Sequence, residues 1–115
     1  MEGTARGKRV RIYLIEDERA SGRPAYQAIV DLLRRERAQG ATLLRAAEGF
    51  GASGELHVPH LVDVAPHLPV VVEWIDTPEQ VERLLPAVRA LVVHGLVTID
   101  DTEMLRVRPP AARTR

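Results

Sequence analysis

The sequence predicts one α+β domain in which four antiparallel strands form a sheet and two helices cover one of its faces. Two segments carry apolar residues at three- and four-residue spacing, and four shorter segments are alternating or β-branched. They follow one another in the order strand, helix, strand, strand, helix, strand. The 115 residues, 45% of them hydrophobic, suffice to bury a core without cross-links.

The first strand is predicted over residues 9–15, because apolar and more polar residues alternate there. This period of two places Val10, Ile12 and Leu14 on one face of a strand. Residues 1–8 are charged and carry glycine, and we expect them to form a flexible tail.

The polar residues 16–23 predict a loop that leads into an amphipathic helix over residues 24–38. Pro24 is suited to the first position of this helix, because its missing N–H would have no partner there. Gly40 is suited to the C-terminal cap, and a second strand is predicted over residues 41–48.

Residues 49–66 mix glycine, proline and histidine without sustained periodicity, which is typical of a long functional loop with at most brief strand ends. Residues 68–75 are rich in β-branched side chains and predict the third strand. Pro69 is expected at the beginning of that strand, because it cannot donate a hydrogen bond within a sheet.

A second helix is predicted to begin after Thr77, which caps it, with Pro78 at the first helical position. Gln80 completes the sequence pattern of a capping box. Pro86 is expected to bend this helix, and Gly95 is expected to end it.

The last strand is predicted over residues 96–100, which completes the ferredoxin-like order βαββαβ. The domain is expected to span residues 9–107, and residues 108–115 to form a flexible C-terminal tail. Leu43 beside Leu44, and the run 70–72, place apolar side chains on both sides of the strands. Two helices on one face cannot cover both sides, so we expect the chain to self-associate.

Composition excludes several classes of protein. The absence of cysteine excludes disulfides and thiolate metal sites and fits a reducing cytoplasm, where we expect the protein to act. Sixteen basic residues balance sixteen acidic ones, and aromatic residues are few, which argues against nucleic-acid binding. No apolar run approaches the ~18 residues needed to span a bilayer, so we expect no direct insertion into a membrane.

Short motifs along nearly the whole domain are shared with a known family. They are Arg11-Ile12-Tyr13, Gly22-Arg23-Pro24-Ala25-Tyr26, Ala28-Ile29-Val30, Gly40-Ala41-Thr42, Gly49-Phe50-Gly51, Leu68-Pro69-Val70 and Gly95-Leu96-Val97-Thr98. With them the sequence resembles the small PII-like proteins of domain family 190, relatives of the PII nitrogen-regulatory proteins. The resemblance implies a homotrimer whose sheets face a common centre, with ligand clefts between subunits and a mobile loop between the second and third strands.

The resemblance also implies ligand-binding residues. Gly49, Phe50 and Gly51 resemble the base of the PII loop, where the backbone approaches an adenine nucleotide. Thr42 resembles the threonine that a neighbouring PII subunit contributes. Phe50 is equally compatible with a ring that faces the ligand and with a hydrophobic plug at the loop base.

The C-terminal half departs from the PII pattern. PII proteins carry a glycine- and lysine-bearing phosphate loop between the second helix and the last strand, where this chain has only His94-Gly95. This departure speaks against triphosphate binding in the PII manner. Arg106 and Arg108 resemble the arginine pair near the PII terminus and are candidates to supply positive charge, although Pro109-Pro110 follows directly.

Two other groups of residues are candidates for chemistry. His57 and His60, with Glu55 and Asp63 nearby, are donor types for a divalent metal, but scattered loop histidines are more often solvated, and no metal site is predicted. The run 16–18 is acidic and is best interpreted as a solvated loop. No serine or threonine is paired with a base, so the sequence predicts no enzyme.

The sequence therefore predicts a PII-like signalling protein that senses a small effector, with an adenine nucleotide as the leading candidate, in clefts between subunits. The loop of residues 49–66 would signal occupancy to a partner protein. One alternative is a divalent-metal-binding trimer of the copper-tolerance type. Another is a regulatory subunit without a ligand that docks on a membrane transporter or channel. Neither the effector nor any cofactor is identified by the sequence.

Overall fold

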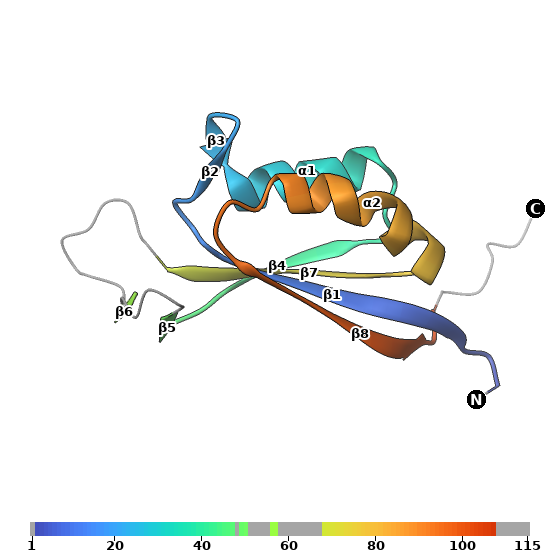
Figure 1. Ribbon diagram of the computed structural model, residues 1–115. Helices are drawn as coiled ribbons and strands as arrows, with labels where there is room; N and C mark the ends of the chain where they lie inside the picture. The colour runs from blue at the N-terminus through green and yellow to red at the C-terminus, as the bar shows by residue number, and fades with distance from the viewer. Residues whose placement is uncertain (1, 48, 51–55, 58–67, 108–115) are drawn as a thin grey trace, which may run out of the picture.

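Four antiparallel strands form one sheet, and two helices lie on the same face of it (Figure 1). The computed structural model describes residues 2–47, 49–50, 56–57 and 68–107. In sheet order the strands are β4 (Ala41–Arg45), β7 (Pro69–Asp76), β1 (Ala5–Ile15) and β8 (Leu96–Met104), and the helices are α1 (Ala25–Arg35) and α2 (Pro78–Ala90). The predicted α+β, ferredoxin-like fold is confirmed.

The core lies between the sheet and the helices. Alternation along β1 buries Val10, Ile12 and Leu14 on the helix-facing side, as the sequence predicts. Trp74 of β7 is fully buried in the same layer. The helices contribute further buried residues, which are Ala25, Ala28, Ile29, Leu32 and Leu33 from α1 and Val81, Leu84 and Val88 from α2.

The one buried charged side chain among the described residues is Asp76, at the end of β7. Its carboxylate accepts hydrogen bonds from the backbone N–H of Gln39 at 3.0 Å, the indole N–H of Trp74 at 3.0 Å and the backbone N–H of Thr77 at 2.8 Å. These donors belong to the connection between α1 and β4, to β7 and to the N-terminus of α2. Asp76 therefore joins three segments of the fold at one point.

β1 and β8 are both longer than the sequence pattern indicates. β1 begins at Ala5, which pairs with Met104 at the end of β8, so residues 5–8 belong to the sheet and not to an N-terminal tail. Cross-strand pairing supports this charged extension, for example between Lys8 and Asp101. A side chain on Gly7 would come within 2.7 Å of the Met104 sulfur, so glycine leaves the space in which Met104 crosses β1.

Both helices end earlier than predicted. α1 ends at Arg35, and the residue with positive φ that closes it is Arg37 (φ 62°), not Gly40. The N–H groups of Arg37 and Ala38 bond the carbonyls of Arg34 and Leu33, the pattern of a Schellman motif. No left-handed glycine is needed, so composition does not mark this boundary.

α2 ends at Ala90, five residues before Gly95. Gly95 instead serves the start of β8, because a Cβ there would lie 2.5 Å from the carbonyl oxygen of Tyr13. Pro86 lies inside α2, and its effect on the helix axis stays a prediction.

The start of α1 also differs in detail. Pro24 precedes α1 as its N-cap and pairs with Arg19 in a small hairpin. This hairpin comprises β2 (Arg19–Ala20) and β3 (Arg23–Pro24). Its turn residues Ser21 and Gly22 both have positive φ, as a type I′ turn requires, and the Ser-Gly pair was the available sequence signal.

The predicted cap of α2 is confirmed, because the Thr77 hydroxyl accepts a hydrogen bond from the backbone N–H of Gln80 at 3.2 Å. The reciprocal half of the capping box is absent from the described contacts. The Gln80 side chain donates to the Arg37 carbonyl, and Asp76 accepts from the Thr77 N–H in its place.

Thr77→Ala should therefore lower the free energy of unfolding by about 1 kcal/mol, since one N–H of the first turn loses its acceptor. Chemical denaturation would measure this change. Thr77→Ser keeps the hydroxyl and serves as the control, with stability near that of the parent. An unchanged denaturation midpoint for Thr77→Ala would mean that water replaces the cap at no cost.

Candidate functional site

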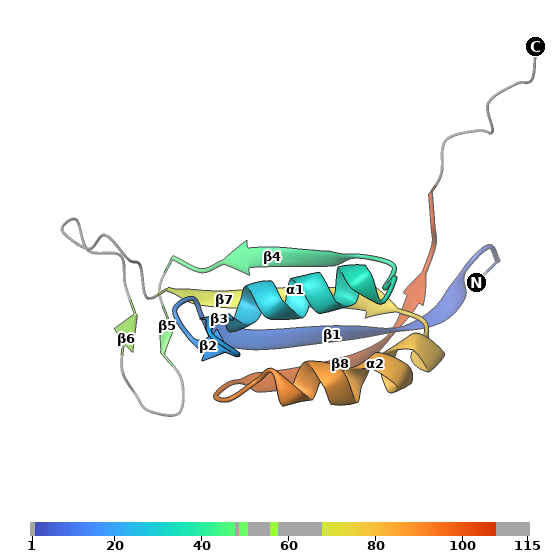
Figure 2. The ribbon, with the colours of Figure 1, turned by 90° about the horizontal axis from the view of Figure 1, so that it is seen from above.

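The loop base lies where β4 ends and β7 begins. The Ala46 N–H bonds the Pro69 carbonyl at 2.9 Å, and the Glu16 N–H bonds the Leu68 carbonyl at 2.9 Å, so the chain leaves and re-enters the sheet at neighbouring points. Between them, β5 (Gly49–Phe50) pairs with β6 (Leu56–His57) beyond the end of the sheet (Figure 2). The described strands within the predicted 49–66 loop thus form a short ribbon rather than a continuation of β4.

Gly49 and Phe50 occupy β5. Gly49 is not among the described residues with positive φ, and its special feature is proximity, because a Cβ there would lie 3.1 Å from Cγ of Pro69. The Phe50 side chain is 73% exposed, which disfavours the plug interpretation and leaves its ring available to a ligand or a neighbouring chain. Gly51 lies outside the described residues.

Charged and aromatic side chains support the loop base. Arg45, the last residue of β4, bonds the Glu16 carboxylate at 2.6 Å, and its guanidinium lies 5.8 Å from the centre of the Tyr26 ring. Glu16 raises the pKa of Arg45 further above its usual range. The Glu16 side chain is mostly buried, and its second oxygen has no hydrogen-bond partner among the described residues. This pair links the residue that follows β1 to the end of β4, across β7, which lies between the two strands.

The remaining predicted ligand-binding residues lie elsewhere in the chain. Thr42 is exposed near the start of β4, opposite Glu73 of β7. Arg106 follows β8 and bonds the Gln39 side chain, at the opposite end of the sheet from β5 (Figure 2). Arg108 lies outside the described residues. A single chain therefore separates the predicted residues into two groups.

The sheet face opposite the helices carries a band of apolar side chains. Leu44, Val71, Tyr13 and Leu96 are in register across all four strands. Leu44 is 50% exposed and Leu96 60% exposed, and neither helix covers this face (Figure 1). The next row on this face, toward the end of the sheet where β4 begins, is polar and contains the Arg11–Glu73 ion pair at 2.9 Å. The two-sided apolar character expected of the strands is confirmed at this band.

Metal ligation gains no support from the described residues, which contain no group of three or more histidine, cysteine and acidic side chains placed to hold an ion. His57 lies in β6, whereas Glu55, His60 and Asp63 fall outside the described parts of the chain. In the acidic run 16–18, Glu16 bonds Arg45. No helix in residues 2–47 or 68–107 is long and apolar enough to cross a membrane.

Comparison with known sequences identifies the family. The model of the DUF190 family, described as "Uncharacterized ACR, COG1993", matches residues 7–104. The chain belongs to the DUF190 family.

Two relatives support this assignment. The chain is 35% identical to a UPF0166 protein of Aquifex aeolicus over 98 residues, which cover 85% of this chain and 92% of that one. It is 29% identical to a UPF0166 protein of Methanocaldococcus jannaschii over 102 residues, which cover 88% and 94%. The resemblance to this family that the sequence motifs indicated is confirmed.

Solved structures of PII-like proteins share the fold. One is CPII, a nitrogen regulatory PII-like protein from Thiomonas intermedia K12, bound to ADP, AMP and bicarbonate, with a TM-score of 0.70 and 21% identity over 90% of this chain and 92% of that one. Another is a candidate PII-like signaling protein from Thermus thermophilus, with a TM-score of 0.60 and 18% identity over 89% and 92%. At these identities the likeness establishes the fold of this DUF190 chain.

The connection between α2 and β8 contains His94, which interacts with Glu18 of the acidic run 16–18. The sequence predicted no role for this contact. Burial raises the pKa of the Glu18 carboxyl, and the charge and backbone of His94 partly oppose that rise. One Glu18 oxygen is buried without a partner among the described residues. His94 beside the glycine of a short connection was the available signal, but its contact with Glu18 depends on the tertiary fold.

Ionised Glu18 therefore costs stability at neutral pH. A carboxyl whose pKa is raised by folding binds more protons in the folded state, so stability increases as pH falls from above the folded pKa toward the ordinary glutamate value of 4.5. Glu18→Gln should be more stable than the parent at pH 7, and this advantage should shrink as pH falls to about 4. Melting temperatures of both proteins across this range would measure it, and an advantage independent of pH would contradict it.

Proposed function

We propose that this chain is a PII-like regulatory protein that binds an adenine nucleotide in clefts between the subunits of a homotrimer. The 49–66 loop would report occupancy to a partner protein, for which a membrane transporter or channel is a candidate. We place this activity in the cytoplasm and assign it no catalytic step. The observation that carries the proposal is the exposed Phe50 beside Gly49 in β5, at the loop base of a fold shared with a protein bound to ADP and AMP.

The apolar band of Tyr13, Leu44, Val71 and Leu96 supports self-association. Several large apolar side chains in one band are costly to leave in water, and burial against other copies removes that cost. A closed ring would also give each copy a neighbour on both sides. Such neighbours offer a way to combine Gly49 and Phe50 of one subunit with Thr42 and Arg106 of the next.

The available positive charge favours a nucleotide with few phosphates. The short His94-Gly95 connection lacks a glycine- and lysine-bearing cradle. Of the two arginines predicted to bind the ligand, Arg106 is the one that lies within the described residues. Phosphate groups require N–H donors and positive charge. We therefore expect AMP or ADP to bind more tightly than ATP.

Calorimetric titration of the full chain with AMP, ADP and ATP, with and without bicarbonate, tests the proposal, and GDP serves as the control for the base. Light scattering on the same sample should give about three times the chain mass. A ligand that binds the folded state must also raise the melting temperature by mass action. A monomer at micromolar concentration would contradict the inter-subunit cleft, and a trimer without adenine-nucleotide binding would contradict the effector alone.

A further inference from the structure

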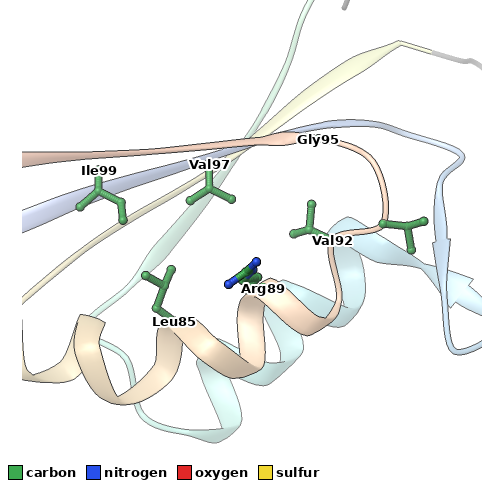
Figure 3. A pocket seen from close by; sticks show the side chains of 7 residues that line it. Leu85, Arg89, Val92, Gly95, Val97 and Ile99 are labelled. Atoms are coloured by element: carbon green, nitrogen blue, oxygen red, sulfur yellow. The ribbon is translucent and has the colours of Figure 1, made fainter. Parts of the chain in front are cut away.

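A groove of about 320 Å³ lies between α2 and β8, on the helix-covered side of the sheet (Figure 3). β8 is an edge strand, so within the described residues no further strand closes the groove from outside. Its lining consists of Leu85 and Arg89 of α2, Val92, Val93 and Gly95 of the following connection, and Val97 and Ile99 of β8.

The walls of this groove are almost entirely aliphatic. Leu85, Val92 and Val97 rest on the core, whereas Val93 is 64% exposed and Ile99 is 44% exposed. Gly95 fixes the end of the groove, because any side chain there would meet the Tyr13 carbonyl of β1. The groove is therefore a largely apolar surface between α2 and β8.

Arg89 is the one charged residue among the described residues that line the groove. Its neighbours three and four positions away are Leu85, Pro86, Val92 and Val93, so the helix offers it no carboxylate at those spacings. Within the part of the chain that the structure describes, the Arg89 side chain forms no hydrogen bond or ion pair, whereas the Arg83 side chain on the same helix bonds Gln80 and Glu36. Arg89 is exposed, so its guanidinium is solvated and available to an anionic ligand beside the aliphatic wall.

We propose that this groove binds a small aliphatic monocarboxylate, with Arg89 holding the carboxylate and the hydrocarbon chain lying against Leu85, Val97 and Ile99. A guanidinium matches a carboxylate through two parallel N–H donors, and aliphatic walls match the chain. The volume of about 320 Å³ lies at the lower end of the roughly 300–1,000 Å³ typical of small-ligand sites, which suits a short aliphatic acid, and octanoate is a suitable probe. The site includes neither Gly49 nor Phe50 and does not depend on nucleotide binding.

A cation in the last turn of a helix also stabilises the helix dipole, and its aliphatic stem can simply cover apolar surface. Those roles require no carboxylate ligand. The two accounts differ in whether the arginine distinguishes an anionic ligand from a neutral one of the same length.

The test is a titration of the full chain, in its native oligomeric state, with sodium octanoate and separately with octan-1-ol, followed by amide chemical shifts. Octanoate should produce saturable shifts at Leu85, Arg89, Val97 and Ile99. Arg89→Gln should weaken octanoate binding about tenfold or more, the loss of one charge-assisted contact, while octanol binding stays unchanged. Arg35→Gln, which removes an exposed arginine from the last turn of α1, should leave octanoate affinity at the parent value.

Three outcomes would overturn the proposal. The first is the absence of saturable shifts at the groove residues. The second is a loss of specificity for Arg89 or for the carboxylate. Arg89→Gln and Arg35→Gln would then weaken octanoate binding equally, or Arg89→Gln would weaken octanoate and octanol binding equally. The third is a set of groove shifts that follows protein concentration and not octanoate, which would assign the groove to a contact with a second copy of the chain.

Discussion

Asp76→Ala should destabilise the protein by about 3 kcal/mol or more, a large share of the roughly 5–15 kcal/mol that holds a domain of this size together. The carboxylate is fully buried and accepts three hydrogen bonds, so its removal leaves the N–H groups of Gln39, Trp74 and Thr77 without an acceptor. Each orphaned buried donor costs about 1–3 kcal/mol, partly offset because no buried charge remains. Urea denaturation of parent and variant would measure the loss.

Asp76→Asn separates charge from geometry. The amide keeps one acceptor oxygen but turns its NH₂ group toward a donor, so the variant should lie between parent and alanine. Asp101→Ala is the matched control, because Asp101 is an exposed aspartate of β8 paired with Lys8, and it should leave the denaturation midpoint nearly unchanged. A small loss for Asp76→Ala, close to that of Asp101→Ala, would mean that water enters and satisfies the three donors.

Local patterns were sufficient for much of the fold. Alternation in 9–15 identified the buried face of β1, and the Thr77-Pro78 pair identified the start of α2, because both features depend on residues adjacent in sequence. The extension of β1 to Ala5 was missed, since its stability comes from pairing with the end of β8, where Met104 lies opposite Ala5. Asp76 was missed because a carboxylate at a strand end usually indicates a solvated turn. Its burial depends in part on Gln39, which is remote in sequence.

The candidate site also combines features that local sequence indicates with contacts that only the tertiary fold creates. Glycines around a phenylalanine indicated the loop base, and the structure places Gly49 and Phe50 there. The Glu16–Arg45 pair and the Glu18–His94 contact join segments remote in sequence, so no local pattern could indicate them. Thr42 and Arg106 remain apart from the loop base within one chain, and the proposed inter-subunit cleft is the arrangement that would bring them together.

Gly49→Val should abolish the nucleotide-induced rise in melting temperature while leaving a folded trimer. A Cβ at this position already lies 3.1 Å from the Pro69 ring, so the two branches of valine must displace either β5 or the start of β7. Gly49 lies beyond β4 and contributes no side chain to the core, so the sheet itself should persist. At a ligand concentration of about 100 Kd, binding stabilises the parent by about 2.7 kcal/mol, and this gain should disappear.

Two companion variants make the result specific to the loop base. Gly49→Ala needs a shift of only a few tenths of an ångström and should reduce the nucleotide response partly. Ala47→Val places the same side chain at an exposed position two residues earlier and should preserve both folding and response. If glycine serves only the turn, Gly49→Val should instead lose stability or solubility, and the trimer that remains should respond normally. Melting temperature with and without ADP, measured on the same preparations, distinguishes these outcomes, and a folded Gly49→Val trimer with an unchanged shift would remove Gly49 from the ligand site.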